Sequence, residues 1–588
     1  MLLRTVAAVV SLLLVAPPAA FAEAPPRQPL AVGWGGAVSS VDPDASQIGI
    51  EVLQRGGNAV DAAVATAAAL GVTDPFSAGI GGGGFFVYYD ADSEKVSTID
   101  GRETAPMSAD ANLFLENGTP LPFAEAMTSG LSVGVPGTPK TWQQALKKWG
   151  TLSLEDALEP AEELARRGFV VDATFNGQVT NNAARFADFT STRALYLPNG
   201  QAPAVGSTFR NPELADTYHE LGRTNLRSLY GGAVGQDLVK TVQQPPVVPG
   251  STRKVRPGNL QLSDLSRYEA PFRQPTKTKY NGFDVYGMAP PSSGGTTVGE
   301  ALNILESYDL GKLTEPEYFH RFIESTKLAF ADRNRWVGDP AFSDVPTREL
   351  LSQRFANSRA CLIKPDSVIK APTAPGDPRK PAPCASSGVE APTRVDAERT
   401  THLTVADRWG NVVAYTLTIE AEGGSGIVVP GRGFLLNNEL TDFNFAPVNP
   451  GVPDPNLPGP GKRPRSSMSP TIVLDDGDVV LALGSPGGAT IITTVTQVLT
   501  SRLDRGLGIQ DAIAAPRVSQ RNSAATPAEK EFLSGPNVPA LEAKGHVFTA
   551  NAEIGAVTAI EPAGRGRWRA AAEPVRRGGG AARVVYPG

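Results

Sequence analysis

One threonine in this chain is placed to act as a nucleophile. Thr400 precedes an alternating polar and apolar run, 401–405, and a turn at 407–411 separates that run from a second β-rich run, 412–418. This pattern predicts a β-hairpin. Before the hairpin lies a segment rich in proline and charge, which we expect to be exposed and cleavable. A cut before Thr400 would give this residue both a hydroxyl nucleophile and a free α-amine to act as its base.

Two other short stretches could bind anionic groups. The run 484–488 contains Gly487 and Gly488 and stands between an apolar strand pattern and a helical pattern that begins near Ile491. Backbone N–H groups in a turn at a helix start can form an anion or oxyanion site. Arg102 ends a strand pattern before a proline break and could fork a carboxylate. A surface ion pair is the ordinary alternative for such an arginine.

Two glycine-rich runs match catalytic patterns without the required context. Residues 79–84 satisfy GxGxxG, but a helical pattern precedes them and a strand follows, which reverses the order that a dinucleotide site needs. Residues 130–134 satisfy GxSxG, yet a Pro-Gly pair follows where a nucleophile elbow needs a helix. We therefore interpret the first as a structural turn or a close backbone approach, and the second as an accidental match in a glycine-rich chain.

Composition indicates a globular protein and excludes several partners. The chain has 588 residues, 41% hydrophobic and 19% charged, enough for more than one ordinary domain. Its formal net charge is -6 without a basic stripe, so nucleic acid is not an expected partner. The four histidines are scattered without ligand spacing, so we expect no metal site. Small molecules or peptides fit better as ligands.

The first 22 residues and the two cysteines indicate an exported protein. Residues 1–22 combine an early arginine, an apolar run and an Ala-Phe-Ala cleavage pattern, as in a secretory signal peptide. No later segment has the about 20 unbroken apolar residues of a membrane span. Cys361 and Cys384 flank a loop rich in proline and lysine, and in an oxidising compartment we expect them to form a disulfide. The periplasm and the medium remain alternative destinations.

Several elements should surround the hairpin. Periodicity and turn residues predict a helix pair within 44–70, mainly helical segments at 139–165 and 209–245 with a loop-like stretch between them, helices near 297–306 and 316–335, a long exposed linker at 362–399, a Pro-rich surface loop at 444–461, and a second hairpin made of 471–474 and 479–483.

Taken together, these pieces resemble the γ-glutamyltransferase family. The motifs that carry the resemblance are Asp74-Pro75 with 79–85, 102–106, 290–295, 400–402, 436–439, Asp442-Phe443, Arg463-Pro464 with 466–470, and 484–488. Each motif is weak alone, but they stand in the family's order from about residue 32 onward. The ordered set is specific.

The resemblance implies an α+β fold of the N-terminal-nucleophile hydrolase type, an αββα sandwich with two stacked β-sheets between helical layers. It implies a precursor that cuts itself between Arg399 and Thr400. The fragments would be a large subunit, 23–399, which includes the linker, and a small subunit, 400–588. The mature protein would be the heterodimer of the two.

The resemblance also implies a reaction that needs no cofactor. Thr400 would attack the γ-carbonyl of a γ-glutamyl compound such as glutathione, and Thr418 on the facing strand would orient its hydroxyl. Backbone N–H groups of Gly487 and Gly488 would stabilise the oxyanion. Water, or the amine of an amino acid or peptide, would then receive the γ-glutamyl group.

The same family pattern assigns a substrate clamp. Arg102, Ser466 and Ser467 match the group that binds the α-carboxylate. Glu439 and Asp442 match the acceptors of the α-ammonium. Holding the zwitterion at both charged groups leaves the side-chain amide as the reactive group.

The sequence departs from the family pattern at three places. Glu420 stands where well-studied members carry Asn, and it adds an acid to the ammonium end of the clamp. The loop 444–461 lacks an obvious tyrosine at its tip, and the segment from Cys361 to Cys384 differs from the usual linker. Glu420 sustains an alternative with the same fold and nucleophile, an amide acylase of the cephalosporin or glutaryl type. An exported binding protein that never matures is a third possibility.

Overall fold

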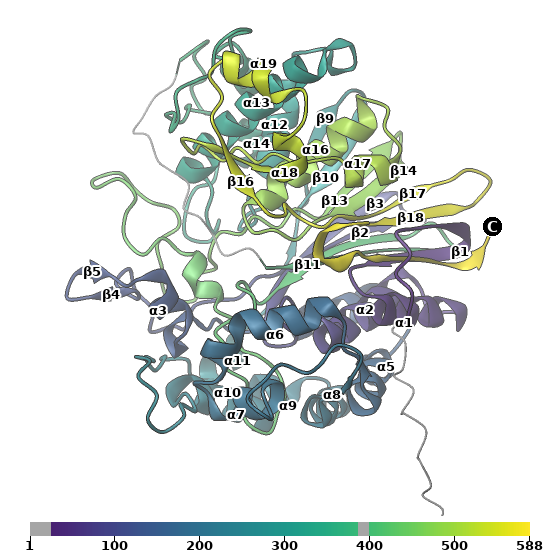
Figure 1. Ribbon diagram of the computed structural model, residues 1–588, viewed down its shortest axis with the longest axis vertical. Coiled ribbons are helices and arrows are strands. Elements are labelled where there is room, and N and C mark those ends of the chain that lie inside the picture. The colour runs from purple at the N-terminus through teal and green to yellow at the C-terminus, as the bar shows by residue number, and fades with distance from the viewer. Residues whose placement is uncertain (1–24, 386–398) are drawn as a thin grey trace, which may run out of the picture.

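The computed structural model describes residues 25–385 and 399–588 (Figure 1). The predicted signal peptide, 1–22, and the part of the predicted linker at 386–398 lie outside the described residues. Among the residues described, no helix combines the length and the hydropathy that crossing a membrane requires.

A large antiparallel β-array forms the centre of the molecule. In the described part of the chain it has 13 strands, in the order β8-β3-β2-β12-β11-β1-β18-β17-β14-β13-β10-β9, with β19 also paired to β1. Their bounds are β1 (Leu30–Ser40), β2 (Gly83–Asp90), β3 (Lys95–Gly101), β8 (Phe272–Arg273), β9 (Thr276–Tyr280), β10 (Phe283–Gly287), β11 (Thr401–Asp407), β12 (Val412–Thr418), β13 (Thr471–Asp475), β14 (Asp478–Gly484), β17 (Thr558–Pro562), β18 (Trp568–Ala572) and β19 (Ala581–Pro587).

The array bends at β1 so that its two halves stack. One part of β1, Leu30–Gly33, pairs with β18, and another part, Gly36–Ser39, pairs with β11. Small and β-branched side chains fill the space between the halves. From one half come Val87, Ala406, Val412 and Ala414, and from the other Ile472, Ala482, Ile560 and Ala570. The expected sandwich is confirmed, and its two layers are hydrogen-bonded to each other through β1.

Helices cover the outer face of each half (Figure 1). On the β11–β12 side, α2 (Ala59–Thr73) has every residue buried, because its alanine-rich surface allows close packing. Leu403 and Val405 on β11 belong to the same core as this helix, whereas Ala406 belongs to the core between the halves, as the alternation along a strand requires. On the other side, α12 (Gly294–Leu305), α13 (Glu315–Trp336) and α16 (Thr490–Leu503) form the second layer.

The remaining elements are shorter or peripheral. They are α1 (Pro43–Gln54), α3 (Phe123–Met127), α4 (Thr138–Trp149), α5 (Leu154–Arg167), α6 (Ala173–Phe186), α7 (Thr190–Tyr196), α8 (Pro212–Thr224), α9 (Arg227–Gly231), α10 (Ala233–Gln243), α11 (Leu262–Arg267), α14 (Thr347–Leu350), α15 (Gln353–Ala360), α17 (Ile509–Ala514), α18 (Lys530–Leu533), α19 (Val538–Ala543), the 3-10 turns η1 (Gly130–Ser132), η2 (Leu310–Lys312), η3 (Glu439–Asp442) and η4 (Arg576–Gly578), and the strands β4 (Leu115–Glu116), β5 (Thr119–Pro120), β6 (Phe169–Val170), β7 (Thr208–Phe209), β15 (Thr526–Glu529) and β16 (Phe548–Asn551).

Both predicted hairpins are confirmed as β11–β12 and β13–β14, and the predicted helix pair is α1–α2. The loop-like interpretation of the stretch between 165 and 209 is wrong, because α6 and α7 lie there. Helix α6 begins at a standard cap, in which the Asp172 side chain accepts a hydrogen bond from the Phe175 N–H at 2.8 Å. Its polar composition concealed the helical period.

The described part of the predicted linker, 362–385, contains no helix or strand but is not uniformly exposed. Thr373 is buried, and its N–H donates to Asn522 Oδ1 at 2.7 Å. The Gly376 carbonyl accepts from Trp336 Nε1 at 2.9 Å. The stretch is therefore exposed only in part: residues 364–367, 379–380 and 382–385 are exposed, as expected, whereas the part around 373–376 packs on the second layer. A disulfide joins Cys361 to Cys384.

Candidate active site

Thr400 lies at the point where β11 begins. In the hairpin Thr401 pairs with Leu417, which places Thr400 opposite Thr418. The two hydroxyl oxygens are 3.2 Å apart. Each hydroxyl is also within donor distance of the Arg399 carbonyl oxygen, at 2.7 Å for Thr400 and 3.0 Å for Thr418. The expected nucleophile thus lies against the peptide bond that it is expected to cut.

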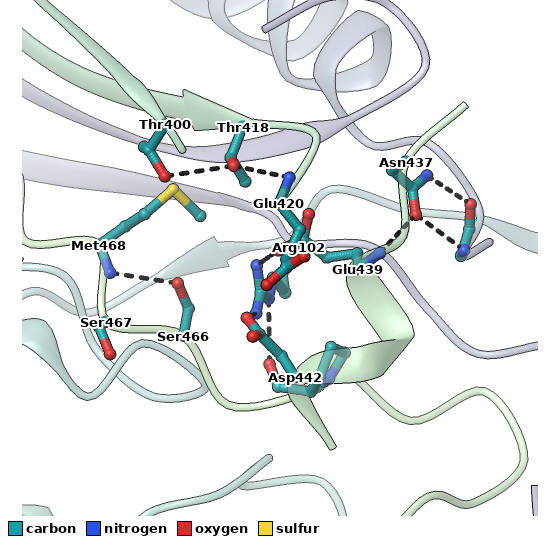
Figure 2. A network of polar contacts seen from close by, with 12 residues as sticks. Arg102, Thr400, Thr418, Glu420, Asn437, Glu439, Asp442, Ser466, Ser467 and Met468 are labelled. Carbon is teal, nitrogen blue, oxygen red and sulfur yellow. Dashed lines mark hydrogen bonds and ion pairs between the residues drawn. The ribbon is translucent and has the colours of Figure 1, made fainter. Parts of the chain in front are cut away.

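A tight turn after β12 fixes the second threonine. The Glu420 N–H donates to Thr418 Oγ1 at 2.8 Å (Figure 2). Glu420 adopts a φ of 77°, in the left-handed region that costs a non-glycine residue about 1 kcal/mol or more. Its carboxylate accepts a hydrogen bond from the Asn438 side-chain amide. Glu420 therefore reaches the pocket as part of a constrained turn.

A pocket brings most of the predicted site residues together. Its lining comprises Arg102, Arg399, Thr400, Thr418, Glu420, Glu439, Asp442, Ser466, Ser467, Met468, Gly488 and Ile491. Of the predicted set, Gly487 does not line it. Residues from both sides of the expected cut, 102 and 399 on one and the rest on the other, contribute to its walls.

Arg102 and the two predicted ammonium acceptors form one charged cluster. The Arg102 guanidinium pairs with Glu439 and Asp442 (Figure 2). It also donates to the carbonyl oxygens of Pro464 at 3.1 Å and Arg465 at 3.0 Å. Arg102 and Glu439 are each 1% exposed. Although burial lowers the pKa of Arg102, the two carboxylates raise it above its usual value. Burial raises the pKa of Glu439, against the lowering effect of the guanidinium.

Asn437 connects this cluster to the two glycine-rich runs. Its side-chain oxygen accepts from the Glu439 N–H at 3.0 Å and from the Gly134 N–H at 2.9 Å. Its amide group donates to the carbonyls of Gly81 at 2.7 Å and Gly134 at 2.9 Å. A Cβ on Gly81 would lie 2.0 Å from the Leu435 carbonyl oxygen, so only glycine fits. The two runs therefore support the site through their backbones.

The two serines have different partners. Ser466 Oγ accepts from the Met468 N–H at 3.2 Å (Figure 2). The Ser466 hydroxyl can therefore donate its proton to a substrate carboxylate. Ser467 Oγ accepts from Arg333 Nη2 at 2.7 Å, and Arg333 Nε donates to Ser293 Oγ at 2.8 Å. Arg333 was missed in the sequence, where it is a cation on the buried face of α13. Its position on the apolar face of the predicted helix could have marked it, because a buried arginine requires polar partners.

The two predicted oxyanion glycines precede α16. Gly487 and Gly488 have φ values of 133° and 53°, which glycine adopts without strain. Within the described residues, the N–H groups of this pair donate to no protein acceptor. Gly488 lines the pocket and so can present its N–H to it.

Two further features bear on the chemistry. His402, two residues after the nucleophile, is buried and hydrogen-bonded to Thr416 Oγ1 at 2.7 Å, and burial lowers its pKa to about 3. It is therefore a neutral structural group. Arg577, which no sequence motif marks, donates from Nη1 to the Thr400 carbonyl oxygen at 2.7 Å. No cluster of three or more His, Cys, Asp or Glu in the described ranges could hold a metal ion.

Known proteins resemble this chain in sequence and in structure over nearly its full length. Residues 45–583 match the family model described as Gamma-glutamyltranspeptidase. The chain is 38% identical over 567 residues to the glutathione hydrolase proenzyme of Bacillus subtilis (strain 168), covering 94% of this chain and 93% of the relative. It is 34% identical over 569 residues to the acylase ACY 1 proenzyme of Pseudomonas sp. (strain V22), covering 94% and 96%. The cephalosporin acylase from Bacillus halodurans has a similar structure, with a TM-score of 0.81, 27% identity and coverage of 96% of this chain and 98% of that one.

Proposed function

Because the chain belongs to the gamma-glutamyltranspeptidase family and has its N-terminal-nucleophile hydrolase fold, we propose that it is a self-cleaving γ-glutamyl hydrolase and transferase. It takes the γ-glutamyl group from glutathione and related compounds through an ester on Thr400. The observation that carries this proposal is the Thr400 hydroxyl at 2.7 Å from the Arg399 carbonyl oxygen, paired with Thr418.

Maturation begins with attack of the Thr400 hydroxyl on the Arg399 carbonyl carbon. The C–N bond between the two residues breaks as a C–O bond forms, so an ester replaces the amide and Thr400 gains a free α-amine. Water then hydrolyses the ester and leaves a carboxylate on Arg399. Thr418 supports the step, because its hydroxyl is 3.0 Å from the oxygen on which charge develops. The products are the large subunit, 23–399, and the small subunit, 400–588, which stay together as a heterodimer.

The same hydroxyl performs turnover. Thr400 Oγ1 attacks the γ-carbonyl while its own α-amine takes the proton. The N–H groups of Gly487 and Gly488 stabilise the oxyanion, and collapse expels the leaving amine, which receives that proton. Water or an acceptor amine then attacks the acyl-enzyme. The acceptor is an amino acid or a peptide.

The charged cluster supports a γ-glutamyl substrate. Arg102, with Ser466 and Ser467, binds the α-carboxylate, and Glu439 with Asp442 binds the α-ammonium. In the structure these opposite charges are paired with each other. A zwitterion can therefore enter as a replacement for existing ion pairs, so that no buried charge is left without a partner.

An amide acylase is the second candidate, and Glu420 favours it together with the acylase relative. The two activities differ in one substrate group, because a glutaryl compound lacks the α-ammonium. Turnover of γ-glutamyl and glutaryl anilides by the purified protein separates them. We expect a higher kcat/KM for the γ-glutamyl anilide, since the glutaryl compound leaves Glu439 and Asp442 without their cation. Preference for the glutaryl anilide would reject the γ-glutamyl assignment.

Two features support an exported enzyme. The signal-like segment 1–22 supports export to the periplasm or the medium. The disulfide between Cys361 and Cys384 is consistent with an oxidising compartment.

A further inference from the structure

Arg577 contacts the nucleophile from a distant part of the chain, 177 residues away in sequence. We propose that Arg577 is a positioning residue that fixes the Thr400 main chain and favours the neutral form of the α-amine released at cleavage. The inference rests on the proposed function, since it concerns the amine that acts there as the base.

The backbone of Arg577 has a conformation that favours glycine, which suggests that the arginine side chain makes a specific contact. Arg577 has φ 54° and ψ 34°, in the left-handed region, inside the short turn η4. An L residue with a long side chain is strained there, whereas glycine is not, and glycine occupies the next three positions. The side chain donates from Nη1 to the Thr400 carbonyl oxygen at 2.7 Å, and Asp74, Glu422 and Glu553 lie near its charge.

The turn that carries Arg577 is held at several points. The Arg577 N–H donates to Glu553 Oε2 at 3.1 Å, and the Arg577 carbonyl accepts from Thr174 Oγ1 at 3.3 Å. Arg27 donates to the Gly579 carbonyl of the same turn. The guanidinium is thus placed by a fixed backbone, and it can in turn fix Thr400 before and after the cut.

Charge gives the contact its second role. The charged groups that face Thr400 or Arg577 are Arg102, Arg399, Asp74, Glu420, Glu422, Glu439, Asp442 and Glu553. Burial lowers the pKa of Arg577 to about 10, so the guanidinium remains charged at neutral pH. The carboxylates in the pocket favour an ammonium on Thr400. Arg577 opposes them at short range.

The distance between the two groups sets how far the Arg577 charge lowers the pKa of the Thr400 α-amine. A guanidinium bonded to the carbonyl oxygen of Thr400 lies roughly 5 Å from the nitrogen of the same residue. At that separation, a like charge lowers the pKa of an α-amine by about one pH unit. An α-amine ordinarily titrates near pH 8. The shift therefore brings the pKa of this α-amine to about 7, where the free base and the ammonium are about equally populated.

The test compares three variants by the pH dependence of kcat/KM for a γ-glutamyl anilide. Arg577→Met removes the charge and the donor but keeps much of the side-chain length. Arg577→Lys keeps the charge. Arg27→Met is the matched control, because Arg27 contacts the same turn through Gly579 but no contact joins it to Thr400.

We expect the acid limb of the profile to move up by about one pH unit in Arg577→Met, to return close to the wild-type position in Arg577→Lys, and to stay in place in Arg27→Met. An unmoved limb in Arg577→Met, or an equal movement in Arg27→Met, would overturn the inference. Absence of γ-glutamyl turnover in the wild type would instead overturn the proposed function.

If Arg577→Met is not cleaved, it has no free α-amine and gives no pH profile. The rate of cleavage of the other variants is then the measurement. Electrophoresis over time then follows maturation of the other two variants. The inference expects Arg577→Lys and Arg27→Met both to mature. Arrest of Arg577→Lys, or arrest of Arg27→Met, contradicts it.

Discussion

The guanidinium of Arg102 and the carboxylate of Glu439, 337 residues apart in the sequence, form a buried ion pair in the wall of the pocket. The pair joins the two parts of the chain that cleavage would separate. It also brings into contact two groups that we assign to opposite charges of the substrate. One pair of residues therefore links the stability of the fragments to recognition of the substrate.

The first prediction concerns this pair. Arg102→Met should raise KM for a γ-glutamyl anilide at least about tenfold and lower the free energy of unfolding by about 3–5 kcal/mol, because it leaves buried carboxylates without their cation. Kinetics and thermal denaturation measure the two effects. The double variant Arg102→Met with Glu439→Gln should recover much of the stability but not the affinity. A normal KM in Arg102→Met would contradict the substrate clamp.

The second prediction concerns Thr418. Thr418→Val keeps the shape of the side chain but removes the hydroxyl that lies 3.2 Å from Thr400 Oγ1 and 3.0 Å from the Arg399 carbonyl oxygen. Loss of one such hydrogen bond costs about 1–3 kcal/mol, so maturation and kcat should each slow by about 5- to 100-fold. Thr418→Ser, which keeps the hydroxyl, is the matched control. Equal rates in both variants would remove Thr418 from the mechanism.

Local patterns were sufficient to predict the hairpin that presents Thr400 and the turn that carries Gly488. They depend on strand alternation and glycine positions within about ten residues. The ordered motifs then identified the pocket residues through family resemblance. Helix α6 was not predicted because polar residues divide its short apolar stripe. Only the capping residue Asp172 marked its start.

Long-range contacts could not be predicted in this way. The contact between Arg577 and Thr400 and the one between Arg333 and Ser467 each join segments brought together by the fold, and no local period encodes them. The same holds for Asn437, whose side chain contacts Gly81, 356 residues earlier. A buried cation or amide signals that partners exist, but the fold decides which.

The third prediction concerns the pH dependence of stability. Asp42 caps α1, where its side chain accepts from the Ala45 N–H at 2.9 Å, and burial raises its pKa from 3.8 to about 7. Between these two values the folded state binds more protons than the unfolded state, so stability falls as the pH rises through this window. Above pH 7 the ionised carboxylate lowers the free energy of unfolding by at most about 4 kcal/mol. Solvent screening makes the effect smaller, because the Asp42 side chain is only half-buried.

Asp42→Asn tests this effect, because asparagine keeps the cap and removes the charge. The variant should melt at a higher temperature than the wild type at pH 8 and at a similar temperature at pH 4. Calorimetry at the two pH values measures the difference. Ser153→Ala in the cap of α5 is the control, since it removes a cap without changing a charge and should lower the melting temperature at both. A uniform effect of Asp42→Asn across pH would contradict the raised pKa.

The central claim is that Thr400 cuts the chain before itself and then serves as the catalytic nucleophile. N-terminal sequencing of the bands of the purified protein tests it most directly. We predict two fragments in roughly a two-to-one ratio of lengths, with the smaller one beginning Thr400-Thr401-His402, and a single uncut chain in Thr400→Ala. An intact wild-type chain, as a binding protein that never matures would give, or a cut at another bond, would contradict the account.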